Sequence, residues 1–138
     1  MSEITGILNN SSGFGAVSGG IADSRDLELA YFQGNPQAKL AVEMFCYKIS
    51  KVIASYFVPL QCIPDAIVFT AGIGERSPLK RKIIVQNLAP FGIQIDDEES
   101  NEKNDLILSQ GRVKILVIRT NEELVIAQET CEIVSKIQ

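Results

Sequence analysis

The chain has 138 residues and a net charge of −4, and 46% of its residues are hydrophobic against 22% charged. This composition predicts an ordinary globular domain with one core, and the negative charge excludes a broad electrostatic grip on nucleic acid or anionic lipid. No apolar run approaches the roughly 20 residues of a membrane span, and the first ten residues lack the features of a secretory signal. We therefore expect a single cytoplasmic domain with no nucleic-acid or membrane partner.

Residue types restrict the chemistry further. Histidine is absent, which excludes Ser-His and Cys-His catalysis and imidazole metal ligands. Cys46, Cys62 and Cys131 are widely spaced among apolar residues. We expect them to be reduced core side chains rather than a disulfide or a zinc site.

The first part of the chain is expected to be loop followed by helices. Residues 1–21 hold half of the ten glycines and predict a Gly/Ser-rich loop with little regular structure. Asp23 is placed to cap a short helix over ADSRDLELAYF. From Gln37 to about Leu60, spacing by three and four predicts the longest helix, with an apolar face made of Leu40, Met44, Ile49, Val52, Ile53, Tyr56 and Phe57.

The second part alternates strands with helices. Residues 66–70 (AIVFT) predict a buried parallel strand, and Ser77 and Pro78 begin a helix that stops near Pro90. Residues 92–97 alternate like an edge strand, and residues 97–111 are expected to be a surface excursion with at most one helical turn. Residues 112–120 predict the second core strand. The final helix should turn inward the side chains of Leu124, Ile126, Ala127, Cys131 and Val134.

This order of elements predicts an α/β fold with crossover connections, although two core strands and one edge piece make a thin sheet for so many helices. In such sheets, ligands bind at the carboxyl ends of strands. The stretch TAGIGERSP follows the first strand, and its Gly72 and Gly74 would let a ligand approach the backbone and would allow positive φ. It lacks the third glycine of a Rossmann fingerprint and the Gly-Lys-Ser/Thr of a P-loop, so a turn that needs glycine for its own geometry is the alternative.

Two further stretches are candidate sites. In TNEEL, Thr120 or Asn121 can cap the last helix, and Glu122 and Glu123 lie in its first turn. Carboxylates there complement the helix dipole, or one of them reaches a hard cation beside a phosphate. In DSRD, Arg25 contacts a ligand or pairs with a neighbouring carboxylate.

Three separated stretches in one order resemble the acetate kinase family, which belongs to the actin, sugar kinase and Hsp70 superfamily. They are SGFGAVSGGIADSRDLE, DAIVFTAGIGERSP and VKILVIRTNEELVIAQET, and the likeness runs from about Ile7 almost to the end. Propionate kinases are similar over the same region. The resemblance implies that residues 1–138 are one partial domain, the C-terminal part of a ribonuclease H-like (actin-like ATPase) nucleotide-binding domain with few core strands and several helices.

The resemblance also implies an activity, the Mg²⁺-dependent transfer of the ATP γ-phosphoryl group to acetate, giving ADP and acetyl phosphate. Three segments would serve it. The family's nucleotide-contacting Asp-x-Arg segment corresponds to Asp23, Ser24 and Arg25. Its adenosine loop corresponds to Gly72, Ile73, Gly74, Glu75 and Arg76. Its Mg²⁺-supporting glutamate corresponds to Glu122.

The sequence departs from the family pattern in three places, and it also covers only part of the family's length. Arg76 stands where the family has Asn, Arg119 where it has Pro, and NNSSGF where it has a lysine-bearing K-S-G-L. More importantly, the resemblance covers only about the last third of an acetate kinase. The acetate pocket, the catalytic aspartate and the phosphate loop would lie upstream, so no catalytic residue can be placed in this chain.

We therefore expect the C-terminal portion of an acetate kinase, truncated or from an interrupted gene, which is nearly inert alone. A propionate kinase fragment, a stand-alone nucleotide-binding or interaction module, and a purely structural domain are the alternatives. Apolar surface left open by the missing part would favour a homodimer or other self-association.

Overall fold

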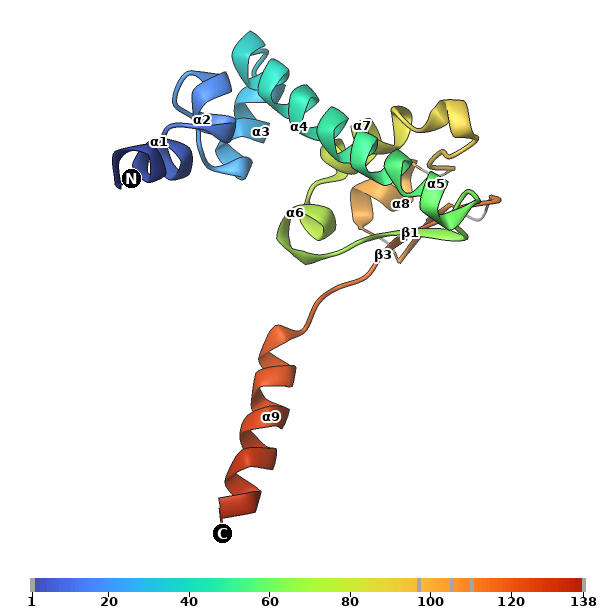
Figure 1. Ribbon diagram of the computed structural model, residues 1–138. Coiled ribbons are helices and arrows are strands. Elements are labelled where there is room, and N and C mark those ends of the chain that lie inside the picture. Colours follow the sequence, from blue (N-terminus) through green and yellow to red (C-terminus); the bar gives the residue numbers. More distant parts are fainter. Residues whose placement is uncertain (1, 97, 105, 110, 138) are drawn as a thin grey trace.

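A computed structural model describes residues 2–96, 98–104, 106–109 and 111–137. Figure 1 shows α4 running from a group of helices at the N-terminal end to a small sheet, and α9 extending away from the body. The elements in chain order are α1 (Ser2–Asn10), α2 (Gly13–Ser18), α3 (Ser24–Phe32), α4 (Pro36–Ser55), α5 (Phe57–Leu60), β1 (Ala66–Phe69), α6 (Ala71–Arg76), α7 (Pro78–Gln86), the 3-10 helix η1 (Ala89–Phe91), α8 (Glu98–Lys103), β2 (Ile107–Ser109), β3 (Lys114–Val117) and α9 (Glu122–Ile137).

The sheet has the strand order β1-β3-β2. Strands β1 and β3 are the two predicted core strands, and they pair in parallel from Ala66 opposite Lys114 to Phe69 opposite Val117. The α/β class and the thin sheet are thereby confirmed. Strand β2 pairs antiparallel with β3, so β1 is an edge strand of the described sheet.

Two predictions around β2 are wrong. Residues 106–109 were expected to lie in a surface excursion, but Leu108 is buried and the Ser109 hydroxyl donates to the Asp96 carboxylate at 2.9 Å. The alternating stretch 92–96 forms no strand. Gly92 adopts φ 74° at the end of η1, and the stretch contributes the bond from the Asp96 N–H to the Leu108 carbonyl. The pairing partner of β3 thus comes from the later segment.

The loop expected over residues 1–21 is also wrong, because α1 and α2 lie there. In α2, Phe14 packs against Phe45 of α4 with ring centroids 4.9 Å apart, and Val17 lies against the same core. The Ser18 hydroxyl closes the end of α2 by donating to the Ile21 carbonyl at 2.9 Å. Tertiary contact of two apolar side chains spaced by three residues therefore overrides the low helix propensity of glycine.

The long helix α4 begins as expected, but it buries a different face. Asn35 accepts hydrogen bonds from the Gln37 and Ala38 N–H groups and Pro36 occupies the first turn. The buried positions are the small ones, namely Ala38, Ala41, Val42, Cys46 and Ser50. Of the predicted apolar face, Ile49, Ile53 and Phe57 pack against the core, whereas Leu40, Met44, Val52 and Tyr56 are half or more exposed. Small residues let α3 and α7 approach α4 closely, which determines the buried side.

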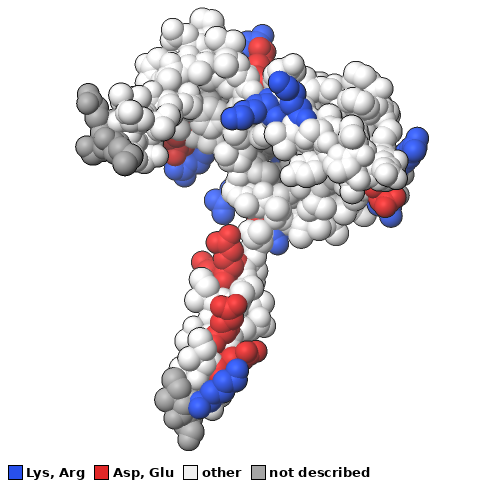
Figure 2. All heavy atoms as spheres, in the orientation of Figure 1, with Lys and Arg blue, Asp and Glu red and all other residues white. Residues whose placement is uncertain are grey.

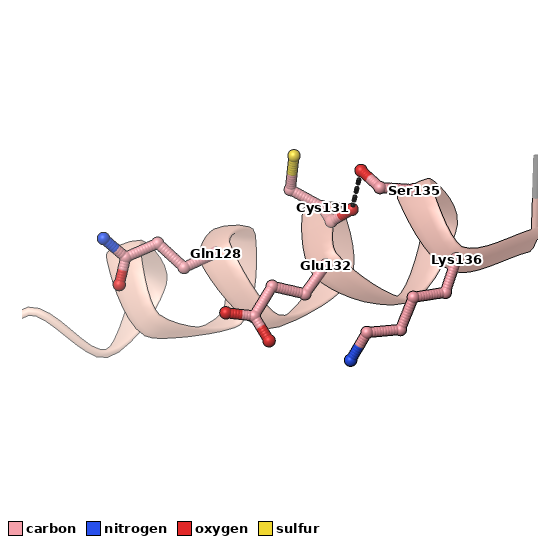
Figure 3. Close-up of a pocket in the computed structure, with 5 residues that line it drawn as sticks. All are labelled: Gln128, Cys131, Glu132, Ser135 and Lys136. Atoms are coloured by element: carbon pink, nitrogen blue, oxygen red, sulfur yellow. Dashed lines mark hydrogen bonds between the residues drawn. The ribbon is translucent and has the colours of Figure 1, made fainter.

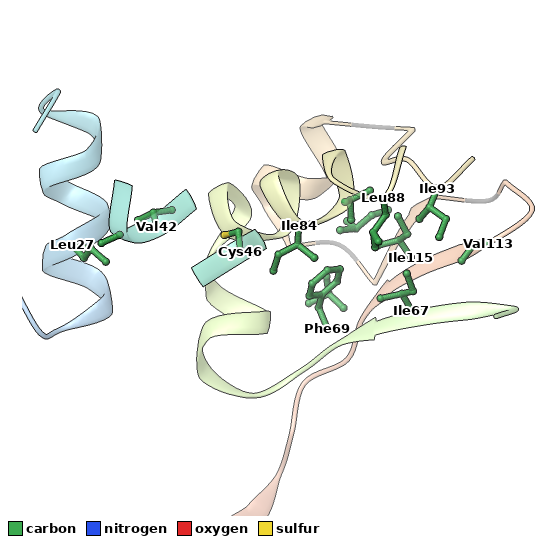
Figure 4. Packing of buried hydrophobic residues seen from close by; sticks show 14 of the residues in the cluster. Leu27, Val42, Cys46, Ile67, Phe69, Ile84, Leu88, Ile93, Val113 and Ile115 are labelled. Carbon is green, nitrogen blue, oxygen red and sulfur yellow. The ribbon is translucent and has the colours of Figure 1, made fainter. Parts of the chain in front are cut away.

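The core lies between the sheet and α7 and continues along α4 (Figure 4). Its members near the sheet include Ile67, Phe69, Ile84, Leu88 and Ile115. Within the described part of the chain, no helix is both long and apolar enough to cross a membrane.

Helix α9 forms as predicted but is exposed along residues 122–136. Extended residues after β3 carry it away from the body (Figure 1). The side chains expected to point inward are therefore in solvent, namely Leu124, Ile126, Ala127, Cys131 and Val134. The expectation of three core cysteines holds only for Cys46, because Cys62 and Cys131 are exposed.

Candidate functional site

The stretch predicted to be a glycine loop after the first strand is the short helix α6. Thr70 precedes it, and Ala71 carries the left-handed backbone conformation, with φ 57°. Gly72 and Gly74 lie inside the helix and neither has a positive φ. The expectation that these glycines supply positive φ is therefore wrong.

The two glycines have different surroundings. A Cβ atom added at Gly74 would lie 3.3 Å from the Phe69 carbonyl carbon and 3.5 Å from its Cα. Close packing of α6 on the end of β1 thus explains Gly74. A Cβ atom at Gly72 would meet no atom within 4 Å, and Gly72 is exposed. The fold itself gives no reason for glycine at position 72.

A cavity of about 250 Å³ adjoins this helix. It is lined by Phe45, Ile49, Val68, Phe69, Thr70, Ile73, Gly74, Lys80, Arg81 and Ile84. Ligand pockets usually hold about 300–1,000 Å³, so this one has room for a ring rather than for a whole nucleotide. Its mostly apolar side chains suit a flat base better than a phosphate.

Glu75 connects α6 to the segment before α9. Its carboxylate oxygen Oε1 accepts hydrogen bonds from the Thr120 backbone N–H at 2.7 Å and from the Thr120 hydroxyl at 3.1 Å. The backbone bond is the main reason why the pKa of Glu75 is lowered. Two of the three predicted segments, the glycine stretch and TNEE, are therefore in direct contact.

Glu122 and Glu123 lie in the first turn of α9, which Asn121 caps by accepting the Leu124 N–H at 3.1 Å. Both carboxylates are exposed, and Figure 2 shows acidic side chains following α9. In the described ranges, no three acidic or cysteine side chains are grouped to hold a metal ion. Glu122 alone fits Mg²⁺ only as one ligand among phosphate and water oxygens.

Further along α9, five side chains surround a shallow hollow, namely Gln128, Cys131, Glu132, Ser135 and Lys136 (Figure 3). The Ser135 hydroxyl donates to the Cys131 carbonyl at 2.7 Å. Because all five belong to one exposed helix, this hollow is open helix surface rather than an enclosed site.

The third predicted segment begins α3. Asp23 caps the helix by accepting the Arg25 N–H at 2.7 Å, and the Arg25 guanidinium donates back to both of its oxygens at 3.2 and 3.1 Å. These bonds, with that of the Arg25 side chain foremost, lower the pKa of Asp23 from 3.8 to about 2. The side chain of Arg25 is 91% exposed, and Ser24 between them is half-buried. Of the two alternatives for Arg25, the structure contains the pair with Asp23, which is weak enough at the surface to exchange for a ligand.

A buried ion pair, which sequence reasoning missed, joins α3 to the start of α7. The Lys80 ammonium donates to Glu28 Oε2 at 2.6 Å, and the Ser77 hydroxyl donates to the same oxygen at 2.7 Å. Lys80 is only 1% exposed. Lysine in a sequence KRK is usually solvated, so the only sequence signal was the preceding Ser-Pro start, which fixes the orientation of this turn.

The next residue, Arg81, is fully buried. Its guanidinium donates to the Gly74 and Glu75 carbonyls at 2.8 and 2.9 Å. It also donates to Asn101 Oδ1 at 2.9 Å and to the Asn101 carbonyl and Asn104 Oδ1, both at 2.7 Å. Burial lowers the pKa of Arg81, and these five acceptors compensate its desolvation.

The two arginines that depart from the family pattern are both at the surface. Arg76 lies in the last turn of α6, where a cation complements the helix dipole. Arg119 is exposed in the extended segment between β3 and α9.

Comparison with known proteins identifies the family of the chain. Residues 1–128 match the acetokinase family. An acetate kinase from Coprothermobacter proteolyticus is 42% identical over 135 residues, which cover 96% of this chain and 34% of that protein. One from Methanosarcina acetivorans is 47% identical over 134 residues, covering 95% and 33%. The chain thus spans about a third of the length of the curated relatives it matches.

Solved structures give the same result. A propionate kinase from Francisella tularensis superposes with a TM-score of 0.84 at 40% identity, covering 94% of this chain and 33% of that one. The Porphyromonas gingivalis acetate kinase superposes with a TM-score of 0.82 at 32% identity, covering 96% and 34%. The predicted class, part of an actin-like ATPase fold, is confirmed by these structures. The chain belongs to the acetokinase family and corresponds to a part of an acetate or propionate kinase.

Proposed function

We propose that this chain is the nucleotide-binding portion of a cytoplasmic kinase that, when complete, transfers the ATP γ-phosphoryl group to acetate to form acetyl phosphate. The observation that carries the proposal is Gly72. A Cβ atom there would meet no atom within 4 Å, and the nearby Thr70, Ile73 and Gly74 line an apolar cavity at the end of β1. Because the fold does not need glycine there, the approach of a ligand to the backbone is the remaining reason for it.

The three segments have separate roles in this proposal. Gly72, Ile73 and Gly74 of α6 receive the adenosine, whose flat base suits the apolar cavity. Asp23, Ser24 and Arg25 contact the nucleotide at its edge, and Glu75 and Arg76 complete that edge. Glu122 supports Mg²⁺ together with the nucleotide phosphates; when bound, the ion neutralises negative charge on them.

We further propose that the chain has no phosphoryl-transfer activity by itself. Transfer depends on positioned groups around the γ-phosphate. The resemblance places those groups in the part of an acetate kinase that this chain does not match. Acetate is the proposed acceptor because the curated relatives are named acetate kinases, and propionate is the alternative because one similar structure is a propionate kinase.

The test is a Gly72→Ala variant, measured by calorimetry with ATP and Mg²⁺ and by chemical denaturation. Alanine should leave the free energy of unfolding unchanged or raise it by up to about 1 kcal/mol, since glycine is unfavourable inside a helix. Nucleotide affinity should fall by about tenfold, because the added methyl group stands where the ligand approaches.

Gly74→Ala is the matched control. Its Cβ would press on the Phe69 backbone, so it should lower the free energy of unfolding by about 1–3 kcal/mol, as overpacking does. If the unmodified chain binds no nucleotide at millimolar concentration, the proposed function is wrong. If Gly72→Ala binds as tightly as the unmodified chain, the role given to Gly72 is wrong.

A further inference from the structure

Helix α7 begins with two adjacent buried cations. Lys80 is 1% exposed and Arg81 0% exposed. Neighbouring side chains on a helix diverge by about 100°, so the two reach different elements. Burial of two adjacent positive charges is unfavourable unless each has specific partners. Some of those partners, the carbonyls of Ser24, Gly74 and Glu75, lie in two of the segments proposed to hold the nucleotide.

Lys80 reaches the start of α3. Besides its 2.6 Å bond to Glu28, its ammonium lies 3.4 Å from the Ser24 carbonyl and 3.4 Å from the Ser77 hydroxyl. Ser24 is the middle residue of the segment Asp23 to Arg25. Lys80 therefore fixes the backbone from which the exposed Arg25 projects.

Arg81 reaches the end of α6. It donates to the carbonyls of Gly74 and Glu75, which belong to the glycine segment. Asn101 and Asn104 hold the other side of the guanidinium. Because the guanidinium is a rigid planar fork, these contacts fix the orientation of α6 as well as its distance from α7.

We infer that Lys80 and Arg81 are positioning residues, which hold the α3 start and α6 at a fixed separation from a common helix turn so that both segments meet one nucleotide. The inference rests on the proposed function. Both side chains border the cavity, but each is at most 1% exposed and its charged group is engaged by the hydrogen bonds above, so both act through the segments they bind.

The first measurement needs no ligand. Amide hydrogen exchange is compared in the full chain and in Lys80→Met, Arg81→Met and Lys82→Met. Lys82 is the control, since it follows in the same sequence but makes a surface pair with Glu98 at 3.1 Å. Lys80→Met should speed exchange at residues 25–27 and Arg81→Met at residues 74–77, while Lys82→Met should change neither. If residues 25–27 and 74–77 exchange in every variant at the same rate as in the unmodified chain, the inference is overturned.

The second measurement is ATP affinity in the presence of Mg²⁺. Lys80→Met and Arg81→Met should each weaken it by about tenfold, within the range over which coupled sites change affinity. Arg81→Lys should not restore it, because an ammonium has three donors and cannot serve five acceptors in a plane. Full affinity in Lys80→Met and Arg81→Met would overturn the inference and leave the proposed function standing.

A double variant separates positioning from stability. Glu28→Met combined with Lys80→Met replaces the buried pair by apolar side chains of similar length, which commonly restores or raises stability. The bonds to Ser24 and Ser77 remain absent, so thermal stability should recover while affinity stays about tenfold weak. Recovery of both would reduce Lys80 to a structural residue and overturn the inference. If the unmodified chain binds no nucleotide, the proposed function fails, and the exchange measurement still decides whether the two cations position the segments.

Discussion

At the scale of single residues, Asp23 couples a helix cap to an ion pair, and the ion pair requires the ionised form of Asp23. Its pKa in the folded chain is about 2, below the ordinary 3.8. A carboxyl group with a lowered folded-state pKa contributes stability that is complete above the ordinary value and is lost as the pH falls through the folded value. The contribution of Asp23 should therefore disappear between about pH 4 and pH 2.

An Asp23→Asn variant isolates this contribution, because asparagine keeps the cap but has no charge for Arg25. Urea denaturation of both proteins across this pH range should show the unmodified chain more stable near pH 5. The difference should shrink as the pH falls to about 2. A constant difference in the free energy of unfolding between the two proteins over the whole pH range would contradict the lowered pKa of Asp23.

The same scale shows what sequence could reveal of the site. Two of the three predicted segments are in direct contact, through the bond from the Thr120 N–H to Glu75, and the binding roles of all three stay predictions. Of the two reasons given for the glycines, the positive φ was wrong, since the left-handed residue is Ala71, and the approach of a ligand stays a prediction. Lys80 and Arg81 were missed because charged side chains are buried only when partners distant in sequence surround them, and a single sequence does not display those partners.

At the scale of elements, α9 and α7 carry isoleucines in opposite environments. Ile133 is 59% exposed on α9, and Ile84 is 3% exposed under the sheet. The substitution Ile84→Ala should lower the free energy of unfolding by about 2–5 kcal/mol through the cavity it leaves. Ile133→Ala should change it by less than about 0.5 kcal/mol, as exposed substitutions do.

Sedimentation of the Ile133→Ala variant and of the unmodified chain tests the proposed self-association. We propose that copies of the chain associate through the exposed apolar side of α9, so Ile133→Ala should weaken association while leaving the monomer as stable as before. A monomeric unmodified chain at high concentration, without dye-binding apolar surface, would contradict this.

Element prediction succeeded where the signal was local and failed where it was not. The cap at Asp23, the Ser77-Pro78 start and the apolar run of β1 each lie within a few residues, and each was placed correctly. Strand β2 is only three residues long and is defined by its pairing with β3. Helix α2 depends on its contact with α4 through Phe14. Both required tertiary information that local propensity does not contain.

At the scale of the whole molecule, the chain has a core and a small sheet, which has three strands among the described residues. Strand β1 lies at the edge of the described sheet, with Val68 47% exposed. The thin sheet was expected from the sequence, and the share of about a third of each relative agrees with it. An edge strand and an unpacked helix are surfaces that further protein can cover.

Adding the rest of an acetate kinase should therefore produce activity. We expect that mixing this chain with a separately made amino-terminal portion, comprising the other two-thirds, gives acetate-dependent transfer from ATP, measured by trapping acetyl phosphate with hydroxylamine. Either portion alone should be inactive, and the Gly72→Ala chain should give weaker activity at low ATP. A stable complex without any transfer would rule out complementation.

The two cations of α7 also restrict how this chain can change length. Insertion of one residue between Ser77 and Lys80 would rotate both side chains by about 100° around the helix axis. Lys80 would then leave Glu28, and Arg81 would leave Gly74 and Glu75, in a single step. Insertions and deletions should thus not be tolerated in the first turn of α7, because the spacing of its residues determines which segments Lys80 and Arg81 reach.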